Sequence, residues 1–309
     1  MATAPLDARR ALLSGLIDDA GLFPPASLPL EEAAASHEKS RTGEHRFMLG
    51  RFVCPASRLE ELRPAVERST EPWRISALLD LPEEEVWPGE VGGALEQVRS
   101  FVKQSEGAAR VDLVEVRLAE ATVESVEPAV RAFCEIFQWS GLGAFPLLEI
   151  PFRSSWKSEV PAVLEAIAGA PPRMGAKLRC GGASADAFPS PEQVALFIDG
   201  CRRHGLPMKA TAGLHHPYRH LDPETGFMRH GFLNLATSAV FGREEEIVAD
   251  QEGEHFSLSE QALRWRDLEA GAEAIAATRR DLFISYGSCS FDEPVADLVT
   301  MGVLPLARP

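Results

Sequence analysis

The chain has 309 residues, of which 45% are hydrophobic and 25% charged, the composition of a globular protein with a large core. Its formal net charge of −15 argues against a nucleic-acid or anionic-membrane surface, because both need clustered cations. The sequence has no apolar run long enough for a membrane span and no apolar segment of a signal peptide near its start, so we expect a cytoplasmic protein that acts on a small molecule.

Strand-like and helix-like segments alternate along the chain. Eight apolar runs are typical of buried strands, at 12–18, 47–54, 74–80, 111–118, 145–152, 176–180, 207–214 and 282–288. Amphipathic patterns predict helices at 29–40, 56–67, 92–104, 123–139, 158–169, 191–205 and 293–303. The long segment 217–280 is predicted to hold two more helices, at 231–242 and 259–280.

Eight such β/α units predict an α/β protein, a single (β/α)8 TIM barrel over 1–309, in preference to an open doubly wound sheet. Neither GxGxxG nor GxxxxGK[ST] follows any of the runs, which removes the main support for the common nucleotide-binding folds. The insertion at 217–280, after the seventh strand, is long for a β/α loop and suits a lid or a contact in a homo-oligomer.

The five cysteines are scattered and form no CxxC pair, which predicts reduced thiols rather than disulfides or a zinc ribbon. Lysine usage is more informative. The chain has five lysines against 26 arginines, yet Lys177 and Lys209 both lie inside strand-like runs. A buried unpaired charge is costly, so these ammonium groups must pair with carboxylates, face a cleft or bind a ligand.

Several other ionisable residues fall in the predicted strands or at their carboxyl ends, where barrel active sites lie. The candidates are Asp18, Arg51, Glu115, Arg117, Glu149 and Arg179. Five of the eight histidines lie between His204 and His230, around the seventh strand. We expect His215 to act as an acid, base or metal ligand and His216 to contact the substrate, since adjacent side chains point apart.

Lysine in a barrel interior suits imine chemistry, because a neutral amine attacks a carbonyl carbon. Lys177 or Lys209 would be the nucleophile and the other its electrostatic partner, with Glu149, Asp18 or His215 moving protons. Arg51, Arg117 and Arg179 would bind an anionic substrate. Backbone amides at Gly181 and Gly182, together with Ser288, would bind its phosphate or carboxylate.

The run KATAG at 209–213, with Lys177 on the preceding strand, resembles class I aldolases of the deoxyribose-phosphate aldolase type. That resemblance implies a barrel lyase that forms a Schiff base and needs no cofactor. The family's K-[TS]-x-T-G-like motif covers five residues here, and its partner lysine comes before the motif.

Two alternatives stay open. The run FPLLEIPF at 145–152 is similar to the glutamate strand of magnesium-dependent citrate-lyase-like and pyruvate aldolase barrels. That similarity implies Mg²⁺ or another divalent metal on Glu149, with His215 a further candidate ligand and Arg117 or Arg51 on the substrate carboxylate. Such a site would serve a metal-dependent lyase, isomerase or hydrolase. The other alternative is a non-catalytic barrel that acts as a binding or scaffold protein, in which the lysines pair with Glu115 and Glu149.

Overall fold

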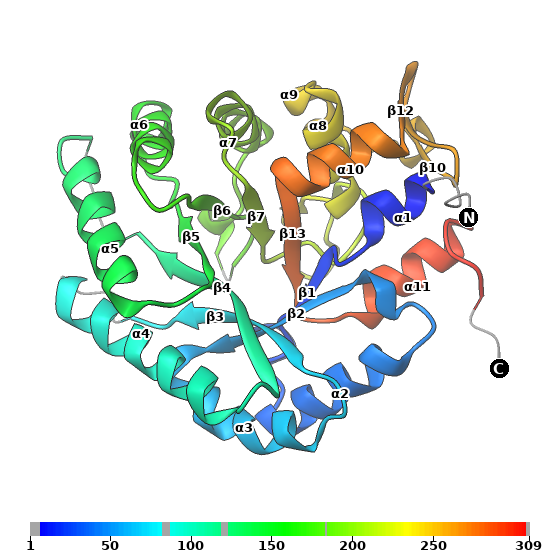
Figure 1. Cartoon of the computed structure of the whole chain (residues 1–309). Coiled ribbons are helices and arrows are strands. Elements are labelled where there is room, and N and C mark those ends of the chain that lie inside the picture. Colours follow the sequence, from blue (N-terminus) through cyan, green and yellow to red (C-terminus); the bar gives the residue numbers. More distant parts are fainter. Residues whose placement is uncertain (1–6, 82–86, 119–122, 183, 307–309) are drawn as a thin grey trace.

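The computed structural model describes residues 7–81, 87–118, 123–182 and 184–306. Eight parallel strands close into a barrel in the order β1-β13-β7-β6-β5-β4-β3-β2, and Figure 1 shows helices around its outside. The barrel strands are β1 (Ile17–Asp19), β2 (Leu49–Pro55), β3 (Trp73–Leu79), β4 (Ala109–Arg117), β5 (Phe145–Glu149), β6 (Gly175–Arg179), β7 (Met208–Thr211) and β13 (Phe283–Ser288). The predicted (β/α)8 barrel is confirmed.

Long amphipathic helices cover the barrel, and most follow the strands as predicted. They are α2 (Leu30–Thr42), α3 (Leu59–Arg68), α4 (Trp87–Gln104), α5 (Val126–Ser140), α6 (Trp156–Gly169), α7 (Pro191–His204) and α11 (Asp292–Thr300). Their apolar stripes pack on the outward side chains of the strands to form one large core. In the described parts of the chain, no helix is long and apolar enough to cross a membrane.

The first predicted strand, 12–18, was wrong over most of its length. Residues Ala8–Leu13 form a short helix, α1, and the strand covers only Ile17–Asp19. The Asp7 side chain accepts a hydrogen bond from the Arg10 amide and so caps α1. Leu12 and Leu13 are fully buried in either conformation, so their apolar pattern could not separate a helix from a strand.

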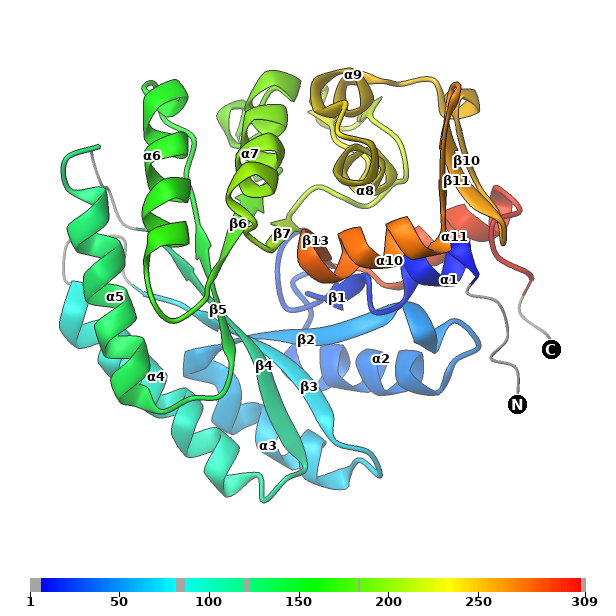
Figure 2. The same ribbon diagram turned by 45° about the horizontal axis from the view of Figure 1, so that its top comes forward.

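The helix predicted at 259–280 was wrong over 259–271 and confirmed over 272–280. Three short antiparallel strands, β10 (Phe256–Leu258), β11 (Ala262–Trp265) and β12 (Leu268–Gly271), precede the shorter helix α10 (Ala272–Asp281). Trp265 pairs directly with Leu268, so a two-residue turn joins β11 and β12. Figure 2 shows this small sheet standing beside α1 and α10.

The segment between β7 and β13 also contains a hairpin of β8 (His220–Leu221) and β9 (Met228–Arg229) and the helices α8 (Phe232–Phe241) and α9 (Glu244–Ala249). The predicted helix at 231–242 corresponds to α8. All of these elements follow the carboxyl end of β7, so the hairpin joins the loops at that face of the barrel. A lid function for the segment stays a prediction.

Candidate active site

The strand register brings a row of polar residues together on five neighbouring strands. Arg117 on β4 pairs in register with Glu149 on β5, Glu149 with Lys177 on β6, Lys177 with Lys209 on β7, and Lys209 with Ser285 on β13. Side chains at the same level of adjacent parallel strands point to the same side. The row therefore places both lysines and a carboxylate in one layer of the barrel.

Within the barrel, carboxylates and ammonium groups alternate in a continuous chain of ion pairs. The Nζ atom of Lys209 lies 2.6 Å from Oδ2 of Asp18 and 2.5 Å from Oε1 of Glu115. Oε2 of Glu115 lies 2.8 Å from Nζ of Lys177, which lies 2.8 Å from Oε2 of Glu149. We call these five residues the lysine–carboxylate network.

Two serines complete the network from strands on either side. The Ser285 hydroxyl donates a hydrogen bond of 2.8 Å to Oδ2 of Asp18, and the Ser76 hydroxyl donates to Oε1 of Glu115. The side chains of Asp18 and Asp19 point to opposite sides of the strand, as those of adjacent strand residues do. Asp18 faces the barrel interior, whereas Oδ2 of Asp19 lies 3.0 Å from Nδ1 of His37 on α2.

Burial and ion pairing shift the pKa values of the network residues in opposite directions, and the effect of ion pairing is the larger. Burial alone would raise the pKa of Glu115, but Lys177 and Lys209 hold that pKa well below its usual range. Burial likewise opposes the ionisation of Asp18 and Glu149, yet Lys209 lowers the pKa of the first and Lys177 that of the second. Burial would lower the pKa of Lys177, and Glu115 and Glu149 raise it instead. These shifts favour the charged forms of the three carboxylates and of Lys177 at neutral pH.

The two lysines differ in their access to solvent. Lys209 is 0% exposed and lies between Asp18 and Glu115, whereas Lys177 is 5% exposed. Two residues beyond Lys177 on the same strand, the Arg179 side chain is 53% exposed, and its Nη1 lies 3.9 Å from Oε1 of Glu149. Arg117 is also exposed at the end of β4. Lys177 and Glu149 therefore form the end of the network nearest the open mouth.

Arg51 was predicted to bind substrate, but it does not lie at the mouth of the barrel. Its backbone amide donates to Oδ1 of Asp18, its Nη1 lies 3.3 Å from the same oxygen, and its Nε lies 3.4 Å from Asp112 near the start of β4. The nearby Arg279 guanidinium donates to the carbonyls of Ser14 and Phe283, where β1 and β13 begin. Arg51 thus supports Asp18 from the amino-terminal end of the barrel.

The histidines after β7 form a separate group from the network. Nδ1 of His215 lies 2.8 Å from Oε2 of Glu293, and its Nε2 lies 3.7 Å from the Sγ atom of Cys289. Nδ1 of His216 lies 2.7 Å from Oδ2 of Asp297. The structure places both histidines against α11 and the loop before it, so His215 does not contact Glu149 or either lysine directly.

Neighbouring side chains lie close to the Cα atoms of the two glycines after β6, of which Gly181 is buried and Gly182 exposed. A Cβ atom at Gly181 would come within 3.2 Å of the Phe188 ring, and one at Gly182 would overlap Ala187. The Gly181 carbonyl accepts a hydrogen bond of 2.9 Å from Nε of Arg179. Ser288 is buried, and its hydroxyl accepts a bond of 3.4 Å from the Ser290 amide. Binding of a substrate anion by Gly181, Gly182 or Ser288 stays a prediction.

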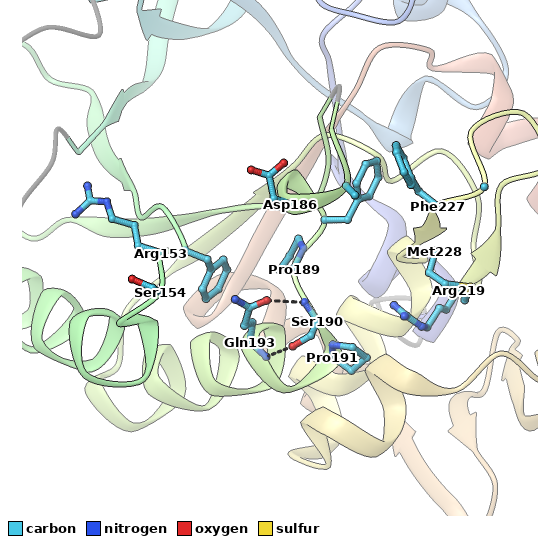
Figure 3. Close-up of a pocket in the computed structure, with 14 residues that line it drawn as sticks. Arg153, Ser154, Asp186, Pro189, Ser190, Pro191, Gln193, Arg219, Phe227 and Met228 are labelled. Carbon is cyan, nitrogen blue, oxygen red and sulfur yellow. Dashed lines mark hydrogen bonds between the residues drawn. The ribbon is translucent and has the colours of Figure 1, made fainter.

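A cavity of about 720 Å³ opens between the loops that follow β5, β6 and β7. Figure 3 shows Arg153 and Arg219 on opposite sides of it, with Ser190 and Gln193 at the start of α7 between them. Ser190 and Gln193 form a reciprocal capping box there. The cavity therefore lies on the barrel face that carries Lys177 and Glu149.

The oxygens of Glu149 already face two cations, Lys177 and Arg179. A divalent metal there would have to displace the Lys177 ammonium group, because like charges at this distance repel strongly in a buried site. In the described residues, no three His, Cys, Asp or Glu side chains converge as metal ligands do. A metal on Glu149 stays an alternative hypothesis.

The sequence predicted a catalytic role for four of the five network residues, whereas Glu115 was an ionisable candidate with no catalytic role assigned to it. A signal for that role was available, since Glu115 stands between two valines in the predicted strand. Ser76 and Ser285 carried no such signal, because a serine in a strand is common and only the closed barrel brings these two to the carboxylates.

The fold and the network together define a closed (β/α)8 barrel whose interior holds two lysines bridged by carboxylates. Two solved structures of a proposed deoxyribose-phosphate aldolase from Toxoplasma gondii ME49 share this fold. One matches with a TM-score of 0.53 and 13% identity over 91% of this chain and 90% of that one. The other, an apo form, matches with a TM-score of 0.52 and 14% identity over 95% and 94%. No family model and no curated protein matches the sequence.

Proposed function

We propose that this protein is a carbon–carbon lyase of the aldolase type, which acts on a small anionic carbonyl compound through an imine on Lys177. One observation carries the proposal: Lys177 lies 2.8 Å from both Glu115 and Glu149 in the layer beneath the exposed rim. A lysine with a purely structural role would not need to lie near the open mouth of the barrel. Lys209, which is fully buried between two carboxylates, is better suited to hold charge than to attack a substrate.

The resting ion pairs set the order of the proton steps. Lys177 first gives a proton to Glu149, which replaces a buried ion pair by two neutral groups. The amine nitrogen then attacks the carbonyl carbon, a C–N bond forms, and the carbonyl oxygen takes the proton from Glu149. Glu149 next takes a proton from the carbinolamine nitrogen and gives it to the hydroxyl, which leaves as water. The protonated imine that remains accepts the electron pair of the breaking C–C bond, while Glu149, again a carboxylate, takes the proton of the substrate hydroxyl that becomes the carbonyl of the leaving fragment.

The rest of the network keeps its charges during these steps. Lys209 stays an ammonium group between Asp18 and Glu115. Glu115 accepts hydrogen bonds from Ser76 and Lys209, so its charge stays fixed while Glu149 exchanges protons. Arg117 and Arg179 at the rim offer guanidinium groups for a substrate carboxylate or phosphate. This mechanism uses side chains alone and requires no cofactor.

Borohydride trapping tests the proposal. Purified protein is reduced in the presence of a panel of aldehydes and 2-oxo acids, and the modified peptide is identified by mass spectrometry. We expect a substrate-dependent adduct on Lys177. Lys177→Arg should abolish it, and Lys157→Arg, at an exposed lysine on α6 that pairs with Glu192, should leave it unchanged.

An adduct on Lys209 would contradict the choice of nucleophile. If no carbonyl compound gives an adduct and elemental analysis of the same sample finds a divalent metal that Glu149→Gln removes, the metal-dependent alternative is supported instead. Absence of both adduct and metal would favour the non-catalytic alternative.

A further inference from the structure

The cavity between the loops after β5, β6 and β7 contains an arginine without a carboxylate partner. Arg219 is partly buried there, and burial alone lowers its pKa. In the described parts of the chain, its guanidinium forms no ion pair, and its side-chain contact is Nδ1 of the buried His230 at 3.1 Å. A partly desolvated cation that faces an open cavity is stabilised by an anion brought from outside the chain.

The chain holds Arg219 in place by a defined set of contacts. The Nε2 atom of His230 lies 2.6 Å from the Pro189 carbonyl oxygen, to which it donates, so the neutral ring accepts from Arg219 at Nδ1. Burial lowers the pKa of His230 to about 4, with Arg219 adding to the effect. The Arg219 backbone amide donates to Oδ1 of Asn234, 2.9 Å away. The guanidinium is therefore positioned by an uncharged acceptor that does not compete for an anion.

Other parts of the lining suit an anion attached to an apolar group. The amino-terminal end of α7 contributes a favourable helix dipole, and Arg153 is a second cation on the opposite wall. Asp186 is the carboxylate in the lining, and it is exposed. The aromatic rings of Phe188 and Phe227, with centroids 5.3 Å apart, form an apolar wall.

We infer that this cavity binds an organic anion, a carboxylate or phosphate carried on an apolar or aromatic group, with Arg219 as its main charged contact. Nothing in the proposed imine chemistry requires this site. Its position suggests a use, however: Ala185 and Asp186 line the cavity, and the turn Ala185–Ala187 packs against Gly182 beside Arg179. Arg179 in turn approaches Glu149. If the proposed function holds, the cavity takes an anionic end of the substrate of Lys177 that extends beyond Arg117 and Arg179.

Direct binding measurements test the inference without any need for turnover. Inorganic phosphate and phenyl phosphate are titrated into the full chain by isothermal calorimetry. We expect saturable binding of phenyl phosphate that is at least about tenfold tighter than that of phosphate. Arg219→Ala should weaken it about tenfold or more, the loss of one charge-assisted contact, and Arg219→Lys should restore part of it.

Two further variants distinguish the loss of a specific contact in the cavity from a general effect of substitution on the fold. Arg243→Ala, at an exposed arginine in the same segment that pairs with Glu246, serves as the matched control and should bind as the wild type does. Phe227→Ala should weaken phenyl phosphate more than inorganic phosphate. The inference is overturned if the wild type shows no saturable binding, or if Arg219→Ala binds as Arg243→Ala does.

The test also keeps the site distinct from the imine mechanism. Lys177→Arg should bind phenyl phosphate with unchanged affinity while giving no borohydride adduct. Normal anion binding with no adduct in the wild type would contradict the proposed function alone. A Lys177 adduct with no anion binding would contradict this inference alone.

Discussion

At the scale of single residues, position in the barrel gives two similar lysines different surroundings. Lys177 and Lys209 occupy matching register positions on neighbouring strands, and each lies between two carboxylates. The difference is solvent access. Glu149 and the exposed Arg179 lie beside Lys177, which is 5% exposed, whereas Lys209 is 0% exposed and its partner Asp18 also accepts from Ser285.

Cys289 differs from the other four cysteines in the same way. Those four are buried, and burial raises the pKa of their thiols. Cys289 is partly exposed, and its sulfur lies 3.7 Å from Nε2 of His215, whose Nδ1 is held by Glu293. Burial raises the pKa of this thiol as well, so reaction depends on His215 as the base that takes its proton.

We therefore predict that iodoacetamide modifies Cys289 at least about tenfold faster than any other cysteine of the native protein, because access and a nearby base coincide only there. His215→Asn should slow the reaction near neutral pH. Peptide mass spectrometry over a time course gives the five rates. Equal labelling of Cys201, a fully buried thiol on α7, would show that the prediction is wrong.

At the scale of elements, the sequence predicted a helix boundary most accurately where capping residues were present. Helix α7 begins after Ser190 with Pro191 in its first turn, as its sequence indicates. The segment 259–271 lacked such a signal and was misassigned. Arg266 adopts a positive φ of 52° in the turn between β11 and β12, a conformation that its sequence does not favour.

The α7 cap gives a prediction at this scale. Ser190→Ala removes the side-chain acceptor of the Gln193 amide and half of the capping box, so we expect a loss of about 1 kcal/mol in the free energy of unfolding. Urea denaturation measures it. Ser158→Ala, in an exposed part of α6, is the matched control and should change the stability by less than about 0.5 kcal/mol. A loss no larger than the control's would refute the role of the cap.

At the scale of the whole molecule, the lysine–carboxylate network joins strands that are distant along the chain. Glu115 on β4 contacts Lys177 on β6 and Lys209 on β7 across the barrel interior. Its removal would take away one of the two carboxylate partners of each buried ammonium group, and breaking buried ion pairs is among the most destabilising changes known.

Glu115→Gln is therefore expected to lower the free energy of unfolding by about 3–5 kcal/mol at pH 7. The two lysines hold the folded-state pKa of Glu115 below its unfolded value, so the stabilisation is present above about pH 4.3 and is lost as pH falls further. Denaturation of both proteins from pH 7 downward should show the difference shrinking in acid. The exposed Glu96→Gln is the control. A difference that grows in acid would contradict this account.

What the sequence determined by itself is the order of elements and the presence of charges in strands. Alternating apolar runs and amphipathic helices predicted the closed barrel, and lysine in buried runs of a chain that otherwise uses arginine marked the interior site. These features are local, because strand and helix periodicity are expressed within a few residues.

Only the tertiary structure decided which charges meet. Glu115 and Lys209 are 94 positions apart, and Ser285 and Asp18 are 267 positions apart, so no local pattern could pair them. Arg51 lies on the strand next to that of Asp18, and His215 follows the strand of Lys209, yet barrel closure directs Arg51 to the opposite end and His215 to α11. Register and closure are properties of the whole sheet, and they fix the direction and depth of each side chain.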